Sequence, residues 1–178
     1  MLAESLIELS VKKPIDKITI KEITDKAGVI RPTFYNHFQD KYELIEWIIK
    51  TELLEPIKPL LNAGMIFEAI VLMLNNISAN SVFYKKALKL EGAVTFNQIA
   101  MKCVYEMFMN IISEKSTGKK SKYRWLTPEV ISTYYAQSLC FITEGWIAQG
   151  MDDIEPKEMA EAYMYLITRS MDDILSEL

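Results

Sequence analysis

The chain has 178 residues, 50% of them hydrophobic, with only 6 Gly and 6 Pro, a composition that argues against disorder and suits a helical protein with a sizeable core. Its formal net charge of -4 does not by itself indicate a partner, because nucleic-acid binding depends on where the cations lie. The sequence has no run of about 18 apolar residues and no secretory leader pattern, so we expect a cytoplasmic protein outside the membrane.

A first helix is predicted at the start of the chain. Leu2, Leu6 and Leu9 recur at helical spacing, and the basic pair before Pro14 ends the pattern. The resulting apolar stripe would cover the two helices that follow, so we expect three helices around one small core.

A second helix and a tight turn come next. Thr19, followed three residues later by Glu22, has the spacing of a capping box, in which each side chain satisfies a backbone N–H of the other residue. A helix should therefore begin near Ile20. Gly28 is placed to end it in the left-handed conformation.

The third helix is predicted from about Arg31 to Phe38. Pro32 fits its first turn, where the missing N–H costs nothing, and Phe34 and Phe38 form an apolar pair that faces inward. The other side chains would face outward, towards phosphates and base edges: Arg31, Thr33, Tyr35, Asn36 and His37. Two helices in this arrangement form a helix-turn-helix, whose second helix lies in the major groove of DNA. The alternative is a small helical core with a polar surface, which the full set of residues at this spacing disfavours.

The segment Ile18–Leu44 (ITIKEITDKAGVIRPTFYNHFQDKYEL) resembles the DNA-binding signature of the TetR/AcrR family of bacterial one-component regulators. The resemblance extends from Leu2 to Leu54 and rests on the spacing of Gly28, Thr33, Phe34, Tyr35, Phe38 and Lys41. It implies an all-α homodimer, with a DNA-binding domain in residues 1–54 and a dimerisation and effector-sensing domain in residues 55–178. It also implies a transcriptional regulator of double-stranded operator DNA, more often a repressor than an activator.

The family pattern can be carried over residue by residue. Thr33, Tyr35 and His37 match DNA contacts of the family, and Lys41 matches a phosphate contact at the start of the fourth helix. Ile30 departs from the pattern, because a small residue such as Ser or Ala is usual there. The complete set of predicted DNA-binding residues is Arg31, Pro32, Thr33, Tyr35, Asn36, His37 and Lys41.

Charged residues are distributed unevenly along the chain. The cations that precede Lys41 are Lys12, Lys13, Lys17, Lys21, Lys26 and Arg31. Acidic residues gather near the C-terminus: Asp152, Asp153, Glu155, Glu158, Glu161, Asp172, Asp173 and Glu177. We expect this asymmetry to orient the molecule on DNA.

A fourth helix is predicted to begin at the capping residue Asp40 and to run to about Leu54, where Pro56 and Pro59 would stop it. Its front end would touch phosphate and its far end would enter the sensing domain. We therefore expect this helix to act as a lever between the two domains.

Three further helices are predicted at about residues 64–77, 81–90 and 95–113. They mix Met, aromatic and branched residues, which can repack around varied apolar ligands, and the pockets of the resembled family lie among such helices. For any single residue the alternative is an ordinary core position. The predicted pocket for an unknown small apolar or amphipathic effector comprises Phe67, Met73, Asn76, Phe83, Gln98, Met101, Tyr105 and Phe141.

Two long helices are predicted after a polar, basic and mobile loop at residues 114–125, one from Pro128 to Gly150 and one from Pro156 to about Leu175. Both are apolar nearly all round, so one side of each needs a partner, which a two-fold dimer with a four-helix bundle would supply. The predicted interface comprises Tyr135, Ile142, Gly145, Trp146, Tyr163, Ile167, Met171 and Ile174. The run Gly145–Tyr163 also resembles a subgroup of the family that includes regulators of dihydroxyacetone kinase operons.

The chain is not expected to be an enzyme. Its only histidine is His37, so one chain cannot build a His-paired nucleophile, a His-rich zinc site or a di-iron site. Cys103 and Cys140 lie in apolar helical patterns, so we predict buried free thiols, no metal and no cofactor. The main alternative is a regulator whose C-terminal domain responds to a protein partner. An exposed apolar groove would favour a protein, and an enclosed pocket a small ligand.

Overall fold

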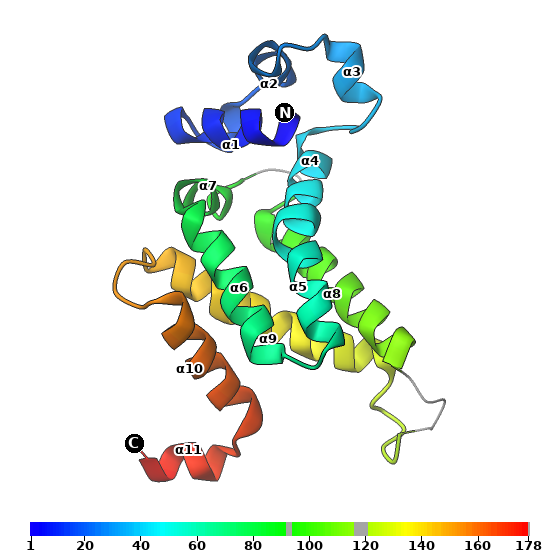
Figure 1. Cartoon of the computed structure of the whole chain (residues 1–178), viewed down its shortest axis with the longest axis vertical. Coiled ribbons are helices and arrows are strands. Elements are labelled where there is room, and N and C mark those ends of the chain that lie inside the picture. Colours follow the sequence, from blue (N-terminus) through cyan, green and yellow to red (C-terminus); the bar gives the residue numbers. More distant parts are fainter. Residues whose placement is uncertain (92–93, 116–120, 178) are drawn as a thin grey trace.

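The computed structural model describes residues 1–91, 94–115 and 121–177, and within these ranges the chain consists of helices without strands (Figure 1). The predicted all-α fold class is therefore confirmed. At one end of the molecule lie α1 (Leu2–Lys12), α2 (Ile20–Ala27) and α3 (Arg31–Tyr35), with a short 3₁₀ turn, η1 (Ile15–Lys17), after α1. We call these four elements the head.

Local capping fixes the ends of α2 as predicted. The backbone N–H of Glu22 donates to Thr19 Oγ1 at 3.3 Å, and that of Thr19 donates to the Glu22 carboxylate at 2.9 Å. Gly28 follows α2 with a φ of 69°, a conformation that costs glycine little. Leu6, Ile23 and Phe34 bring α1, α2 and α3 together and have no exposed surface.

One continuous helical rod joins the head to the rest of the molecule: α4 (Lys41–Ile48), a π-helical segment η2 (Ile49–Leu54) and α5 (Glu55–Asn62). Asp40 caps α4 as predicted, but the prediction that the helix stops near Leu54 is wrong. Pro56 lies in the first turn of α5 and Pro59 lies within it. The chain stays helical because the carbonyl of Glu52, which Pro56 cannot bond, accepts from Asn76 Nδ2 at 3.1 Å.

The body of the molecule contains α6 (Ile66–Ala79), α7 (Ser81–Ala87), α8 (Phe96–Lys115) and α9 (Pro128–Ala148). α8 packs along α9, and α6 packs against α5 and α10 (Figure 1). The head contacts the body where α1 meets α7, and there Lys86 Nζ donates to the carbonyl of Val11 at 3.0 Å. In the described ranges no single helix is long and apolar enough to cross a membrane; α6 and α7 meet that test only together, across an 88° bend.

The last part of the chain forms two helices, α10 (Pro156–Thr168) and α11 (Met171–Glu177), not the single helix to about Leu175 that was predicted. Extended backbone at Arg169 separates them, and Ser170 starts a new capping arrangement: its Oγ accepts from Asp173 N–H at 3.2 Å. Residues 116–120 of the predicted mobile loop lie outside the described residues.

Both cysteines are buried free thiols, as predicted, and burial raises the pKa of each to about 12. We therefore expect neither Cys103 nor Cys140 to react with a disulfide reagent at pH 8 in the folded protein, because the thiolate is the reactive form. Both should react once the chain is unfolded in guanidinium chloride. A Val82→Cys variant, with a thiol on the surface of α7, is the positive control. Rapid labelling of the unmodified folded chain would contradict this expectation.

Candidate nucleic-acid interface

The turn between α2 and α3 is held by backbone hydrogen bonds. After Gly28, the N–H of Val29 returns to the carbonyl of Thr24 at 3.0 Å, and the N–H of Thr33 bonds to the carbonyl of Ile30 at 2.9 Å. Ile30 occupies the N-cap position and makes no side-chain hydrogen bond there. The direction of α3 is therefore set by the turn and by the packing of Phe34.

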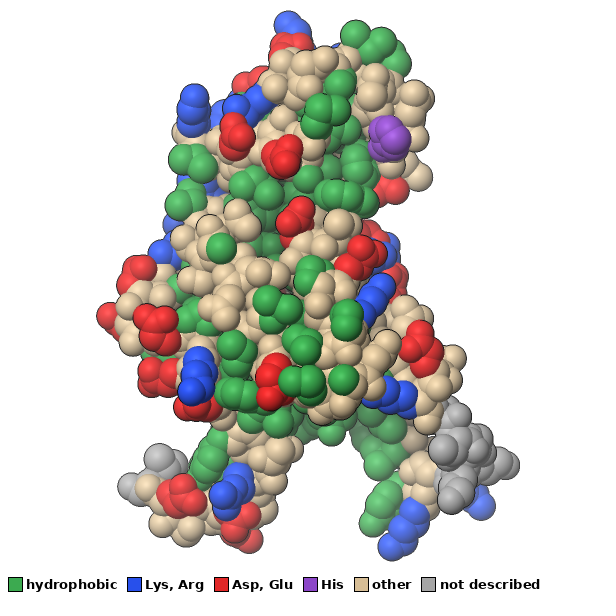
Figure 2. All heavy atoms as spheres, viewed as in Figure 1, with side chains coloured by type: hydrophobic (Ala, Val, Ile, Leu, Met, Phe, Trp, Pro, Cys, Tyr) green, Lys and Arg blue, Asp and Glu red, His purple; other side chains and the backbone are tan. Residues whose placement is uncertain are grey.

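α3 is shorter than predicted, because it ends at Tyr35 and not at Phe38. The N–H groups of His37 and Phe38 both bond to the carbonyl of Phe34, at 3.0 and 2.9 Å, so the chain turns away from the helix axis. Asn36 and His37 consequently lie in the turn after α3. His37 is visible on the surface of the head in Figure 2.

The predicted recognition residues of α3 and its turn lie together on one outward surface. Arg31, Pro32, Tyr35, Asn36 and His37 are exposed, and Thr33 is half-buried. Arg31 Nη2 lies 3.3 Å from the Tyr35 hydroxyl, so the guanidinium and the ring support each other. On the opposite side Phe34 contacts the Phe38 ring, with 5.7 Å between centroids. This surface presents donors and acceptors that can bond to base edges and phosphates.

Lys41 is the exception among the predicted DNA-binding residues. Its ammonium group donates to three backbone carbonyls, those of Ile15 at 3.0 Å, Asp16 at 2.6 Å and Ile18 at 3.3 Å, and burial lowers its pKa. An ammonium group has three N–H donors, and here all are engaged within the protein. The structure thus gives Lys41 a role in fixing η1 against α4, in contrast to the expected phosphate contact.

Ion pairs engage several other cations of the head. Lys13 pairs with Glu22, Lys17 with Asp16, and Lys26 with Glu8. The hydrogen bond from Lys13, with those from Thr19, lowers the pKa of Glu22 to about 2. Among the ion pairs of the described residues none involves Lys12, Lys21 or Arg31. These three cations are therefore not neutralised by an acidic side chain among the described residues.

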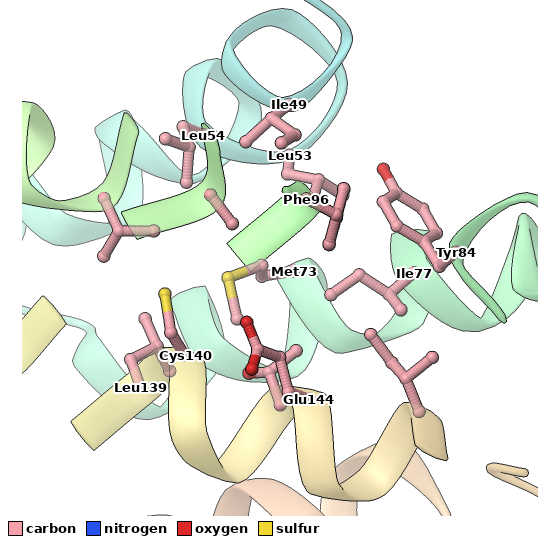
Figure 3. A pocket seen from close by; sticks show the side chains of 14 residues that line it. Ile49, Leu53, Leu54, Met73, Ile77, Tyr84, Phe96, Leu139, Cys140 and Glu144 are labelled. Carbon is pink, nitrogen blue, oxygen red and sulfur yellow. The ribbon is translucent and has the colours of Figure 1, made fainter. Parts of the chain in front are cut away.

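A small apolar cavity lies in the body, between η2, α6, α8 and α9 (Figure 3). Its volume is about 40 Å³, enough for a few water-sized groups and far below the roughly 300 Å³ of a drug-sized site. The hydroxyl of Thr143 at the cavity wall is buried and has no hydrogen-bond partner among the described residues. The Glu144 carboxylate lies beside Met73 and accepts from Asn97 Nδ2 at 2.5 Å.

Most of the predicted pocket residues do not line this cavity. Met73 does line it, but Phe83 is buried elsewhere in the core. Phe67, Met101 and Tyr105 are partly buried and pack against the edge of the core. Asn76 bonds to η2, Gln98 bonds to Thr95 at the start of α8, and Phe141 is 76% exposed. The inner face of α8 is formed by Phe96, Ala100 and Val104, so the prediction chose the wrong face of a helix that is apolar on several sides.

The predicted dimer face is also partly wrong. Trp146 and Tyr163 are buried in their own protomer, and the indole N–H of Trp146 donates to the carbonyl of Ile154 at 2.9 Å. Met171 is exposed, whereas Tyr135, Ile142, Gly145, Ile167 and Ile174 are partly buried. Tyr134 and Leu166, which are outside the predicted interface, and Phe141, which is in the predicted pocket, are all exposed on α9 and α10.

The exposed apolar side chains of α9 recur at helical spacing in the sequence and form a stripe along one side of the helix. Tyr134 and Phe141 are seven residues apart on α9, and Gly145 lies on the same side, where an added Cβ would meet nothing within 4 Å. Beside this stripe a groove of about 940 Å³ runs between α9, α10 and α7.

Two family models match the chain. Residues 4–48 match one described as bacterial regulatory proteins, tetR family, and residues 65–169 match one described as transcriptional regulator C-terminal region. A curated relative is the HTH-type dhaKLM operon transcriptional activator DhaS of Lactococcus lactis subsp. lactis (strain IL1403). It is 26% identical over 152 residues, which cover 84% of this chain and 79% of that protein.

Solved structures share the fold. The dihydroxyacetone kinase operon activator DhaS superposes with a TM-score of 0.65 at 22% identity, covering 93% of this chain and 91% of that one. NalD of Pseudomonas aeruginosa, the secondary repressor of the MexAB-OprM multidrug efflux pump, gives a TM-score of 0.60 at 13% identity, with coverage of 93% and 92%. At these identities the likeness concerns the fold alone.

The outward surface of α3 can be tested by a triple variant, Thr33→Ala with Tyr35→Ala and His37→Ala. Because Tyr35 and His37 are exposed and Thr33 is only half-buried, we expect specific DNA binding to be lost while thermal unfolding stays nearly unchanged. Phe34→Ala is the matched control on the inner side, and it should cost about 3–5 kcal/mol of stability. A large drop in the melting temperature of the triple variant would show that these residues hold the core.

The internal role of Lys41 predicts a different outcome for Lys41→Met. Loss of the charged hydrogen bonds should destabilise the head by about 1.5 kcal/mol, while the slope of log affinity against log salt stays unchanged. Arg31→Gln is the comparison, because its exposed guanidinium should lower that slope by about 1 per subunit without affecting stability. If Lys41→Met lowered the slope and left stability unchanged, that result would support the predicted contact between Lys41 and a phosphate.

Proposed function

The chain belongs to the TetR family of bacterial transcriptional regulators, and on this premise we propose that it binds operator DNA as a homodimer under the control of a small apolar or amphipathic effector. We further propose residues 1–54 as the DNA-binding unit and residues 55–178 as the dimerisation and sensing unit. The observation that carries the proposal is the outward surface of α3, which presents polar side chains. The backbone hydrogen bonds of the turn and the packing of Phe34 against Phe38 fix the direction of these side chains.

DNA recognition then depends on two copies of the head. A helix-turn-helix dimer reads two half-sites about 34–36 Å apart, or a multiple of that distance. Sequencing the genomic DNA that the purified protein retains should therefore return a palindrome with that spacing. A random set of retained fragments would contradict sequence-specific regulation. A reporter gene placed behind the recovered operator would give the sign of regulation, since the named relatives include both an activator and a repressor.

The dimer is supported by the exposed stripe on α9. Aromatic side chains that are largely exposed, such as Tyr134 and Phe141, are costly to leave in water over a contiguous surface. If the two-fold axis passes this stripe, the stripe of one protomer packs against the same stripe of the other. Gly145 leaves room for the two helices to approach closely.

Control by an effector is supported by the position of the cavity. Ile49, Leu53 and Leu54 of η2 form one wall of it, so a molecule that fills the cavity pushes on the rod that carries the head. Filling the cavity with Ala100→Phe should abolish the response to a small effector and shift operator affinity even without it, because the ring itself presses on η2. The alternative controller is a protein partner, for which the groove beside α9 is the supporting feature. A response that survives Ala100→Phe would favour that alternative.

The proposed dimer face predicts that Phe141→Glu yields monomers, because the dimer would bury an unpaired carboxylate at a cost of several kcal/mol. Operator affinity should collapse although the head is untouched, and sedimentation with operator titration would measure both effects. Val82→Glu, which adds the same charge to an exposed apolar position on α7, should remain dimeric. Trp146→Glu should unfold the body, since Trp146 is a core residue. A dimeric Phe141→Glu would place the interface elsewhere.

A further inference from the structure

We propose that each protomer grips its partner at a second contact, outside the α9 stripe. In this contact the tip of one copy, residues 121–127 before α9, packs against the leg of the other copy, formed by α10 and α11. The inference rests on the homodimer proposed above. It is carried by the exposure, charge and position of the two segments.

The tip presents aromatic rings on an ordered turn. Trp125 is 75% exposed and Tyr123 is 60% exposed. Three hydrogen bonds hold their backbone: Tyr123 N–H to Ser121 Oγ at 3.1 Å, Leu126 N–H to Tyr123 O at 3.1 Å, and Thr127 N–H to Trp125 O at 2.9 Å. The turn is also anchored, because the Thr127 hydroxyl caps α9. Exposed Trp and Tyr side chains beside Arg124 have the composition of interface anchors.

The leg presents apolar side chains that the described residues of its own protomer leave exposed. α11 has no buried residue, Met171 is 70% exposed and Leu175 is 60% exposed. The helix is nevertheless held in place, since the Tyr165 hydroxyl donates to the Glu177 carboxylate at 2.6 Å. A seven-residue helix is not stable alone, and the exposed apolar residues of α11 offer a surface that another chain can cover.

The charges of the two segments are complementary. The tip carries Lys122 and Arg124, and α11 carries Asp172, Asp173 and Glu177 against one nearby cation, Arg169. Among the described residues these side chains take part in no ion pair. Apolar surfaces rimmed by opposite charges favour one orientation of docking and disfavour contact between like segments.

The geometry of two-fold symmetry brings the segments together. Two heads can read the same DNA only if the two-fold axis runs from the head towards the opposite end of the molecule. Figure 1 places the tip side of α9 and α11 at that opposite end, on different sides, and Figure 2 shows two separate projections there. In the dimer proposed above this axis passes the stripe on α9, and Figure 1 shows α9 between the two segments, so a rotation about the axis exchanges the sides and keeps the height. It therefore carries the tip of one copy to the side of the other copy's leg, and the contact occurs twice in each dimer.

A disulfide between differently tagged chains tests the contact directly. One chain carries Trp125→Cys and the other Leu175→Cys; both positions are exposed, so both variants should fold. We expect a cross-linked heterodimer only when the two chains are mixed and mildly oxidised, because the native cysteines are buried. Mixing Trp125→Cys with Val82→Cys is the matched control and should give no such product.

Dilution experiments on Trp125→Ala provide the second measurement. Sedimentation should show a dimer dissociation constant raised about tenfold or more, with unchanged thermal unfolding of the diluted chain. The charge variants Arg124→Glu and Asp172→Lys should each weaken the dimer, and combining them in one chain should restore it. Absence of the cross-link, with an unchanged dissociation constant for Trp125→Ala, overturns the second contact and leaves the dimer intact. An unmodified chain that sediments as a monomer overturns the proposed dimer itself.

Discussion

The structure depends on the burial of one uninterrupted rod in two places. The first part of the rod, α4, packs against α1 and α8, η2 packs against α6 and α8, and α5 packs against α6. Ile45 and Ile48 in α4, and Ile49 in η2, are almost completely buried. Each such side chain contributes about 1.5–3 kcal/mol relative to an exposed one. Because no loop interrupts the rod, the head cannot turn without moving side chains in the body.

Polar contacts along the rod reinforce this apolar burial at both ends. In the head, Lys41 donates hydrogen bonds to the backbone carbonyls of η1. Further along, the Glu46 carboxylate accepts hydrogen bonds from Lys50 and from Lys102, and the bond from Lys102 ties α4 to α8. Lys50 also pairs with Glu106, and Asn76 bonds to the Glu52 carbonyl in η2. The wall of the cavity in η2 is therefore connected to the head by directed contacts as well as by packing.

The sequence predicted those features that short-range chemistry determines. Thr19, Asp40 and Thr127 cap helices from within a few residues, so their helix starts follow from the sequence. The start of α11 at Ser170 and Asp173 obeys the same rule but was not predicted, because the apolar pattern of α10 continues through it to Leu175. The burial of Trp146 and the exposure of Phe141 could not be predicted in this way, since α9 is apolar on several faces and tertiary contacts choose among them. The same holds for Lys41, whose partners lie more than twenty residues away.

A change in the length of the rod has an effect that a substitution does not have. Loss of one residue from α4 or α5 would shorten the rod by about 1.5 Å and rotate the head by about 100° about its axis. The residues of α3 would be unchanged, yet the two heads of a dimer would meet DNA at a different spacing. Residues 49–54 form a wider turn, with one residue more than a regular α-helix of the same rise needs, so loss of one residue there would regularise the helix and leave the length of the rod nearly unchanged. The π-helical segment therefore tolerates a single-codon deletion that elsewhere in the rod would alter half-site spacing while the half-site sequence is retained.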